Sequence, residues 1–260
     1  MITRVMNKDR EAVGSYLRST LVNSIGICSK INKYGLESDE LYVYADFWTD
    51  GEIKYVFSVA DGDVTIFSAS NEVDIMDIYV YLRDNYIGYA SVTGEEKKVR
   101  DFQRHTLFRI QEELDVFLAN TRSFREPEFE ENLAVPAHVA DAQEILDLCE
   151  KTQPGFKKHS KQELVQSIKE YGAFLVRDEA GDITAQAIVE EKAGRMVEIG
   201  IYTINREAKD IHSHMAAGAL ATAIIKKKYA CCCRTHVIAQ KQLLKTMGFQ
   251  HVGTDLYLSR

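Results

Sequence analysis

The sequence has no long uncharged apolar run, and its first nine residues contain no apolar segment of the kind that signal peptides carry. Only five of its 260 residues are cysteine, and their spacing does not form a disulfide framework. These absences predict a soluble protein of a reducing compartment. We therefore expect a cytoplasmic protein with no membrane partner.

The chain also lacks an excess of positive charge, since its formal net charge is −7. Broad nucleic-acid binding normally needs a concentrated basic face, so we expect no nucleic-acid partner. A basic substrate stays open. Three of the cysteines are consecutive, Cys231 to Cys233. Neighbours in a strand point to opposite faces, so these three cannot jointly bind one metal ion, and we interpret them as packing residues.

The first half of the sequence predicts a strand, two helices and a run of strands. Asp50-Gly51 and Asp61-Gly62 are strong hairpin signals between alternating apolar segments. The apolar pattern of Leu107–Leu118 fits either a helix or a strand. The predicted elements are a strand at Ile2–Met6, a helix capped by Asp9, a helix at Leu21–Lys33, strands at Leu41–Trp48, Ile53–Val59 and Val64–Ser68, a helix at Asn71–Asn85, a strand at Tyr89–Thr93 and a helix at Glu95–His105.

The second half repeats this order after a charged segment, Arg125–Asn132, whose composition is that of a linker. We therefore expect two domains, residues 1–124 and 133–260, in an α/β (α+β) fold. Its sheet would be mixed and mostly antiparallel, with helices on both faces. The predicted elements are helices at Val139–Cys149 and Lys161–Lys169, strands at Ala173–Arg177, Ile183–Glu190 and Met196–Thr203, a helix from His214, a strand at Cys231–Ile238, a helix at Lys241–Met247 and a strand at Asp255–Leu258.

The stretch from Met196 to Lys228 is the centre of the sequence. A strand passes through a polar loop into a helix for which Ser213 is a suitable N-cap. Unpaired N–H groups at a helix start attract anions, and the small residues Ala216–Ala219 would let backbone approach closely there.

Two local sequences in this half resemble the GNAT superfamily of acyl-CoA-dependent N-acyltransferases. Glu198-Ile199-Gly200-Ile201-Tyr202-Thr203, followed by a loop and a small-residue helix, is similar to the family's fourth strand, acyl-CoA loop and third helix. Leu243–Phe249 is similar to the family's closing segment. The resemblance covers Leu133–Arg260, and the first half resembles a diverged copy, as in tandem GNAT proteins, on element order alone.

The resemblance implies acetyl-CoA as co-substrate and assigns roles on the central strand. The backbone N–H groups of Ile201 and Thr203 would bind the acyl carbonyl and the pantetheine arm. Tyr202 lies between them in the same cofactor-binding segment. Glu198 matches a general base of some members, and the alternative for it is a solvated strand residue or an ion-pair partner.

The loop that follows departs from the family pattern because Asn205–His214 contains no glycine. The first amides of the helix (Ser213, His214, Met215 and Ala216), helped by Lys209 or Arg206, could still hold a phosphate. Glu207 and Asp210 would oppose an anion. His212 and His214 could also pair on a metal, but no third ligand is evident, and we expect no metal site.

The closing segment departs as well, because Leu244 occupies the position of a family Tyr that protonates the departing thiolate. Val237 falls near the position of a family Asn. Tyr202 or Tyr257 would have to replace the missing proton donor, or the thiolate would leave unassisted.

The leading hypothesis is an N-acetyltransferase that moves an acetyl group from acetyl-CoA to a primary amine, small molecule or peptide, by direct attack. The alternative is a non-catalytic GNAT-like module that binds acyl-CoA or a partner as a sensor or scaffold. A third possibility is a structural domain that has lost CoA altogether. No pattern in the sequence indicates the oligomeric state.

Overall fold

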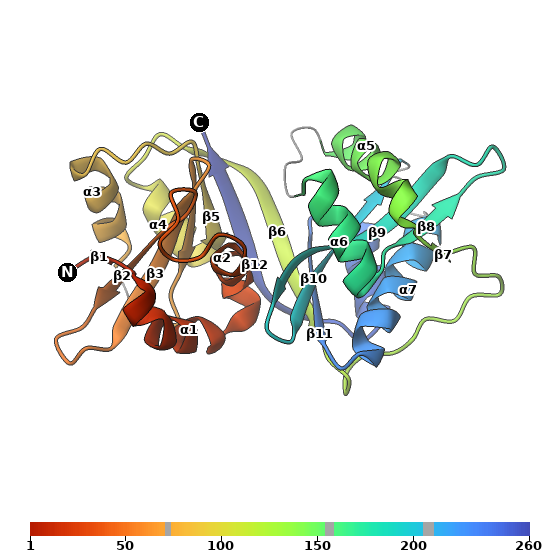
Figure 1. The fold of residues 1–260 in the computed structure, drawn as a ribbon, viewed down its shortest axis with the longest axis horizontal. Coiled ribbons are helices and arrows are strands. Elements are labelled where there is room, and N and C mark those ends of the chain that lie inside the picture. The colour runs from red at the N-terminus through yellow and green to blue at the C-terminus, as the bar shows by residue number, and fades with distance from the viewer. Residues whose placement is uncertain (71–73, 154–158, 205–210) are drawn as a thin grey trace. The chain divides into compact units, whose positions relative to one another are not determined.

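The computed structural model of the chain describes residues 1–70, 74–153, 159–204 and 211–260 (Figure 1). Contacts divide it into two compact units. Unit 1 comprises Met1–Asp115 with Gly253–Arg260, and unit 2 comprises Val116–Val252. These limits differ from the domains expected from the sequence, because the last eight residues group with the N-terminal ones.

Unit 1 follows the order predicted for the first half. Most of the segment Leu107–Leu118, whose pattern fits either a helix or a strand, belongs to the strand β6. The helix expected at Asn71–Asn85 begins at Met76, and residues 71–73 lie outside the described part of the chain. The elements are β1 (Thr3–Arg4), the 3-10 helix η1 (Asn7–Asp9), α1 (Arg10–Arg18), α2 (Leu21–Tyr34), β2 (Tyr42–Phe47), β3 (Ile53–Ala60), β4 (Asp63–Phe67), α3 (Met76–Asp84), β5 (Ser91–Glu95), α4 (Glu96–Gln103) and β6 (Arg109–Ala119).

Unit 2 contains the second series of elements except for most of β12, which groups with unit 1, and the sheet of unit 2 is mixed, as expected. Strands β8, β9 and β10 are antiparallel neighbours, while β10 and β11 are parallel. The elements are β7 (Val135–Pro136), the 3-10 helix η2 (Val139–Asp141), α5 (Ala142–Thr152), α6 (Lys161–Tyr171), β8 (Phe174–Arg177), β9 (Ile183–Ala193), β10 (Met196–Thr203), α7 (Ile211–Lys226), β11 (Ala230–Thr235), α8 (Ile238–Thr246) and β12 (Gln250–Ser259).

The two series have the same order of strands and helices, 3-10 helix included, which confirms two similar lobes. A capping contact recurs with them. The backbone N–H of Met6 donates to Asp9 (3.0 Å), and that of His138 donates to Asp141 (2.7 Å). The second helix of each series ends in Tyr-Gly, and both glycines have positive φ, 80° for Gly35 and 90° for Gly172. A few residue-level traces of the repeat therefore survive.

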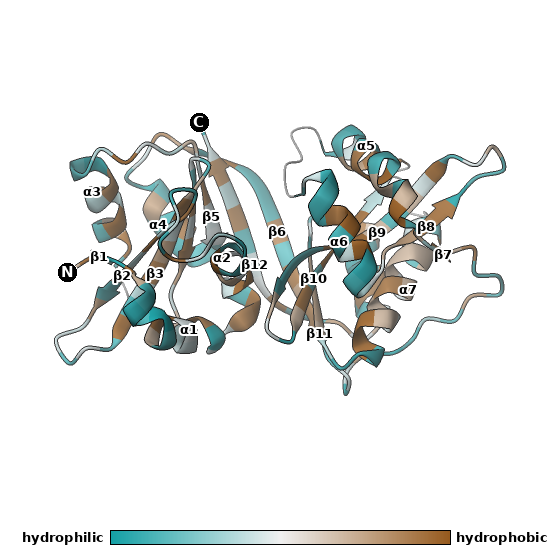
Figure 2. Ribbon diagram, viewed as in Figure 1, coloured by the Kyte–Doolittle hydropathy of each residue, from teal (hydrophilic) through white to brown (hydrophobic). Residues whose placement is uncertain are grey.

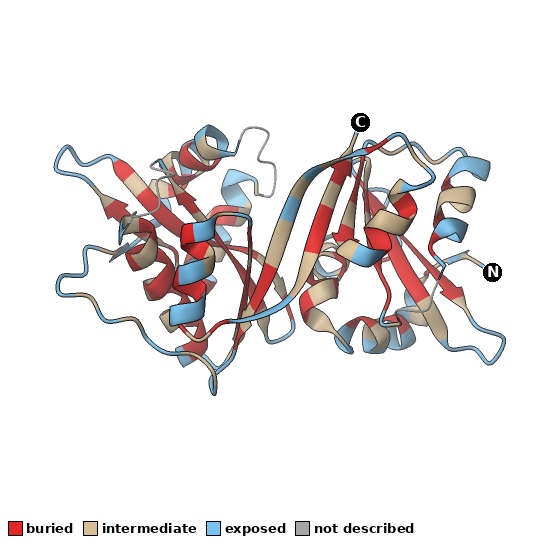
Figure 3. Ribbon diagram, turned by 180° about the vertical axis from the view of Figure 1, so that it is seen from behind, coloured by how far each residue is buried: buried red, intermediate tan, exposed pale blue. Residues whose placement is uncertain are grey.

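Each unit has a sheet with helices packed on both faces. Strand order is β1-β2-β3-β4-β5-β12 in unit 1 and β6-β11-β10-β9-β8-β7 in unit 2. In unit 1, α1 and α2 share a buried cluster on one face, and α3 and α4 share another with β12. In unit 2, α5 and α6 cover one face and α7 and α8 the other. Apolar residues follow these inner faces in Figure 2, and Figure 3 shows the same positions buried.

The long apolar helix α7 belongs to this buried core. It presents Ala217, Leu220, Ala221 and Ile224 to the sheet, at the spacing predicted from the sequence. Within the described residues, no helix is both long and apolar enough to span a membrane.

Candidate functional site

Strands β10 and β11 of unit 2 begin as neighbours and then part. Their parallel ladder has three residue pairs, the last of which is Glu198 with Cys232. Strand β10 continues for five more residues to Thr203, paired on its other side with β9. The backbone edge of Ile199–Thr203 is therefore turned toward an opening in the sheet rather than toward a neighbouring strand.

The direction of the backbone groups on this edge follows from the antiparallel ladder with β9. The N–H of Ile204 donates to the Thr184 carbonyl (3.0 Å), so this pair is a hydrogen-bonded one. Hydrogen-bonded and non-hydrogen-bonded pairs alternate, which makes Ile201 and Thr203 residues whose backbone groups are directed away from β9. These are the two positions predicted from the sequence to present N–H groups to a ligand. The backbone groups of Tyr202, by contrast, face β9.

A glutamine of α8 reaches across the opening. The side-chain amide of Gln240 donates to the Ile201 carbonyl (3.2 Å), which confirms that this carbonyl faces away from β9. The hydroxyl of Thr235 at the end of β11 donates to Gln240 Oε1 (2.6 Å). Both side chains are buried. Gln240 therefore links the separated ends of β10 and β11 and fixes the width of the opening.

The corresponding strands of unit 1 stay together. Strands β4 and β5 pair from Asp63 with Ser91 to Ile66 with Gly94, through four of the five residues of β5. A Cβ at Gly94 would lie 2.6 Å from the Ile66 carbonyl oxygen, and its φ is +154°. The glycine thus permits a closer approach of the two strands than any side chain would. Among the residues that the structure describes, the parallel strands part in the sheet of unit 2 and stay paired in that of unit 1.

The buried lysine Lys98 occupies in unit 1 the place that Gln240 has in unit 2. Each is the third residue of the helix that follows the parallel strand. The Lys98 ammonium donates to the Ser70 carbonyl, beyond the end of β4. Burial lowers the pKa of Lys98.

Glu198 lies at the point where the two strands separate. The residue is 4% exposed, and a carboxylate oxygen is 2.7 Å from a guanidinium nitrogen of Arg234, which is on β11. The ion-paired alternative for this residue is therefore present in the structure. Since the pair straddles the opening, Glu198 is also placed beside any ligand that enters it.

A second carboxylate, Glu190, lies on the same face of the sheet. The register of β9 and β10 shifts beside it, because Glu198 opposes Glu191 while Ile199 opposes Val189. The hydroxyl of Tyr202 donates to Glu190. A Cβ at Gly200 would lie 2.1 Å from Glu190 Oε1, so the contact depends on the absence of a side chain there.

Tyr202 is buried in this polar cluster, and its pKa is raised well above the ordinary value. Burial is the largest cause, and the nearby charge of Glu190 is the next. The phenol therefore stays protonated at neutral pH and serves as a hydrogen-bond donor. It is a weaker acid than an ordinary tyrosine, which argues against its predicted role as proton donor to a departing thiolate.

The start of α7 differs in detail from the predicted phosphate site. The helix already runs from Ile211, so Ser213 is a buried residue of its first turn rather than the N-cap. The amides of Met215 and Ala216 fall within reach of the carbonyls of Ile211 and His212, four residues earlier in the helix. The predicted cofactor ligand Lys209 lies outside the described residues.

Two histidines stand at this helix start. The ring Nδ1 of His212 is 2.9 Å from the Thr184 hydroxyl of β9, which positions the ring against the sheet. His214 is half-buried. Within residues 1–70, 74–153, 159–204 and 211–260, no group of three or more His, Cys, Asp or Glu side chains has the arrangement of a metal site.

The small-residue face of α7 is used by the segment between the two repeats. A Cβ at Gly218 would lie 2.5 Å from the Pro127 ring and 3.6 Å from the Phe129 ring. The backbone N–H of Leu133 is 3.5 Å from Met215 Sδ. The close approach predicted from these small residues is therefore made by the chain itself.

The residues at the altered positions of the closing segment are structural. Leu244 is fully buried in the core that α7 and α8 share. Val237 precedes α8, and its N–H donates to the Thr235 hydroxyl (3.0 Å). Tyr257, the other predicted substitute for the proton donor, is on β12 opposite Thr93 and belongs to unit 1.

The chain has a repeated order of elements, with a parallel strand pair that parts in the second repeat. Structure comparison identifies this as the fold of tandem GNAT proteins. No protein-family profile matches the chain, and no curated protein matches it in sequence.

Three solved structures illustrate the likeness, each over 100% of this chain. A tandem GNAT protein from the clavulanic acid biosynthesis pathway matches with a TM-score of 0.58 at 10% identity over 98% of its length. A GCN5-related N-acetyltransferase from Sphaerobacter thermophilus matches with 0.61 at 9% identity over 95%. A Drosophila protein matches with 0.65 at 10% identity over 98%. The chain therefore has the tandem GNAT fold.

Several polar residues of the site were not predicted from the sequence. Glu190, Arg234 and Gln240 act through contacts between different elements, and nothing in their local sequence marks them. The signal for Glu190 was weak but present, because Gly200 interrupts a strand of large residues, and an isolated strand glycine often indicates close approach of another group.

Proposed function

We propose that unit 2 binds acetyl-CoA or a related acyl-CoA at the opening between β10 and β11 and transfers the acyl group to an amine. The parting of these strands after Glu198 carries the proposal, because it directs the backbone of Ile201 and Thr203 toward the space. Exposed strand edges bind extended, amide-containing ligands by main-chain hydrogen bonds, and the pantetheine arm is such a ligand.

The residues present fit this group in part. The N–H groups of Ile201 and Thr203 would hold the acyl carbonyl and the pantetheine arm, and the first-turn amides of α7 at Ser213 and His214 would face the pyrophosphate. The thioester supplies an activated acyl group. Backbone donors that are already fixed in direction would polarise its carbonyl with little reorganisation.

Glu198 is the proposed general base. It would accept a proton from the attacking amine, directly or through a water molecule, while Arg234 fixes the direction of its carboxylate. Tyr202 and Glu190 would position the amine by hydrogen bonding rather than exchange protons with it. The net charge of −7 suits a basic acceptor, and the five free cysteines suit a reducing, cytoplasmic setting.

Calorimetric titration with acetyl-CoA and with CoA is the test of binding. We expect micromolar affinity, and we expect Ile201→Pro, which removes a donor on the open edge, to weaken it about tenfold or more. Ile201→Val keeps the N–H and should bind like the parent. Thermal denaturation of both variants checks that the strand is intact. An Ile201→Pro variant that keeps its melting temperature and its acetyl-CoA affinity would contradict the proposed binding mode.

Catalysis has its own test, since binding does not require it. With an amine that the protein acetylates, Glu198→Gln should lower kcat by about 10²- to 10⁴-fold and leave acetyl-CoA affinity within a factor of about two. Equal kcat in the parent and the variant over the neutral pH range would exclude Glu198 as the base.

The second candidate is a non-catalytic acyl-CoA sensor. The buried pair of Glu198 with Arg234 favours it, because a carboxylate already paired with a guanidinium is a poorer base. So does Leu244, which leaves the thiolate position without a side-chain donor. Micromolar acetyl-CoA binding with no acetylation of a broad amine panel would support the sensor over the enzyme.

A further inference from the structure

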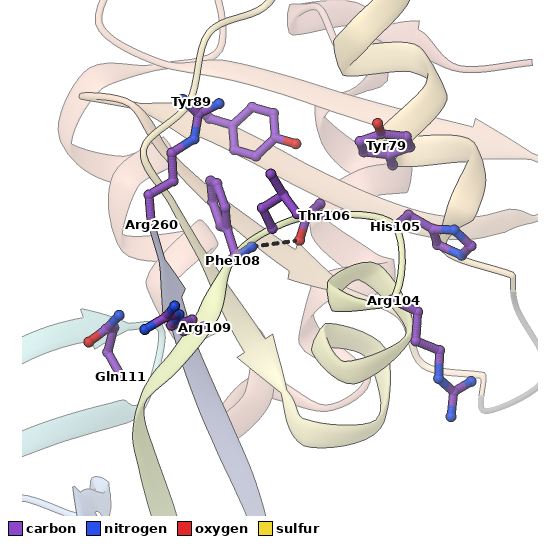
Figure 4. Close-up of a pocket in the computed structure, with 10 residues that line it drawn as sticks. Tyr79, Tyr89, Arg104, His105, Thr106, Phe108, Arg109, Gln111 and Arg260 are labelled. Atoms are coloured by element: carbon purple, nitrogen blue, oxygen red, sulfur yellow. Dashed lines mark hydrogen bonds between the residues drawn. The ribbon is translucent and has the colours of Figure 1, made fainter.

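Unit 1 contains a pocket that the proposed acyl-transfer chemistry does not use. Its volume is about 880 Å³, which suits a small organic ligand. The lining comes from α3, the residues before β5, the turn between α4 and β6, the start of β6, and Arg260 (Figure 4). All of it belongs to unit 1.

The charged side chains of the lining are all basic. They are three arginines (Arg104, Arg109 and Arg260), and none of the ten lining residues is Asp or Glu. In a chain with a net charge of −7 this is a local reversal. Arg104 forms an ion pair with Asp101, whereas Arg109 and Arg260 form none with any residue that the structure describes. The pocket therefore favours an anion.

The floor of the pocket is aromatic and packed. The rings of Tyr89 and Phe108 lie 5.4 Å apart, and Phe108 is 5% exposed within the unit 1 core. Tyr79 stacks on His105 at 6.2 Å. The Arg260 guanidinium is 5.7 Å from the Phe108 ring, and Figure 4 shows it on the side of Tyr89, with the His105 ring near Tyr79. A guanidinium thus lies beside a surface of aromatic rings.

We propose that this pocket binds a nucleotide, with the base against Tyr89 and the phosphate held by Arg109 and Arg260. A free inorganic anion would leave the half-buried rings of Tyr79 and Tyr89 uncovered, and a neutral aromatic would leave Arg109 and Arg260 without a counter-charge. A simple aromatic acid would fill a small part of about 880 Å³, whereas a nucleotide supplies a planar ring, a polar sugar and an anion of matching extent.

Calorimetric titration of the full chain with AMP tests the proposal, with adenosine and inorganic phosphate as separate probes. We expect AMP to bind with a dissociation constant below about 1 mM, and each partial probe to bind at least about tenfold more weakly. The double variant R109Q/R260Q should lose about tenfold or more in AMP affinity, because both charge-assisted contacts disappear. Arg10→Gln, an exposed arginine of α1 outside the pocket, is the matched control.

The same variants separate this site from the proposed acyl-CoA site. Acetyl-CoA should bind R109Q/R260Q as it binds the parent, and saturating acetyl-CoA should leave the AMP isotherm unchanged. Absence of AMP binding, equal AMP affinity in the parent and R109Q/R260Q, or displacement of AMP by acetyl-CoA would each overturn the proposal. None of these results bears on whether acetyl-CoA binds at β10.

Discussion

Replacement of Gly200 by alanine is the sharpest test of the polar cluster in unit 2. A Cβ at this position would lie 2.1 Å from Glu190 Oε1 and 2.7 Å from Tyr202 Cε2. No real structure tolerates such contacts, so Glu190 must swing away from Gly200, and the buried Tyr202 hydroxyl loses its acceptor. We expect the close packing around Gly200 to be disturbed and the hydrogen bond of Tyr202 with Glu190 to be lost.

The magnitude follows from these two losses. A hydrogen bond to a charged group contributes about 1.5–3 kcal/mol, and overpacking of a well-filled site costs about 1–3 kcal/mol. The reduced entropy of the unfolded chain after a Gly→Ala change offsets about 0.4–1 kcal/mol. Gly200→Ala should therefore destabilise unit 2 by about 2–5 kcal/mol.

Urea unfolding followed by circular dichroism measures this effect. Trp48, the only tryptophan, is in unit 1, so its fluorescence reports that unit separately. Gly26→Ala is the matched control, because nothing lies within 4 Å of a Cβ there and the residue is inside α2. That change should stabilise by about 0.5–1 kcal/mol.

A second background identifies the cause. In a protein that already carries Glu190→Ala, the closest atoms to the new methyl group are gone. Gly200→Ala should therefore lower the free energy of unfolding clearly less in that background than in the parent. If it costs the same in both backgrounds, the displaced carboxylate is not the reason, and the close approach of Glu190 to Gly200 plays no part in stability.

Two further predictions concern buried residues at matching or altered positions. Burial lowers the pKa of Lys98 from 10.5, so the charged form of Lys98 destabilises the fold at any pH below the folded-state pKa, and this destabilisation disappears as pH rises through that pKa toward 10.5. Lys98→Met should therefore have a higher melting temperature than the parent at pH 7, with a smaller difference at pH 10. A difference in melting temperature that is independent of pH would refute the electrostatic cause. Leu244→Tyr should lower the free energy of unfolding by about 1–3 kcal/mol without raising any acetylation rate, because the position is fully buried in the core of α7 and α8. An unchanged melting temperature with faster acetylation would show that this side chain faces the thiolate.

Much of the fold could be predicted because its signals are local. Asp-Gly turns, alternating apolar residues and the apolar face of α7 located nearly every element to within a few residues. The 11-residue strand β6 could not be assigned from its own sequence, because aromatic and aliphatic residues at both periods leave the choice to its strand partners.

The site was only partly predictable, for a different reason. Ile201 and Thr203 were predicted from the resemblance of Glu198–Thr203 to the GNAT fourth strand, and the ladder with β9 directs their backbone groups as that resemblance implies. The contacts of Glu198 with Arg234 and of Tyr202 with Glu190 join residues 36 and 12 positions apart. Such pairings depend on where a ladder ends and where its register shifts, and no local pattern encodes either.

The place of β12 has a consequence for the order in which the chain can fold. Residues 255–259 complete unit 1 by pairing with β5, and Leu256 and Leu258 are fully buried in its core. A nascent chain that has emerged only as far as unit 2 therefore carries a unit 1 whose β5 edge is unpaired and whose core lacks two leucines. The half of the protein that is synthesised first therefore becomes complete last. Loss of these final residues would destabilise unit 1, most of which lies at the N-terminal end of the sequence.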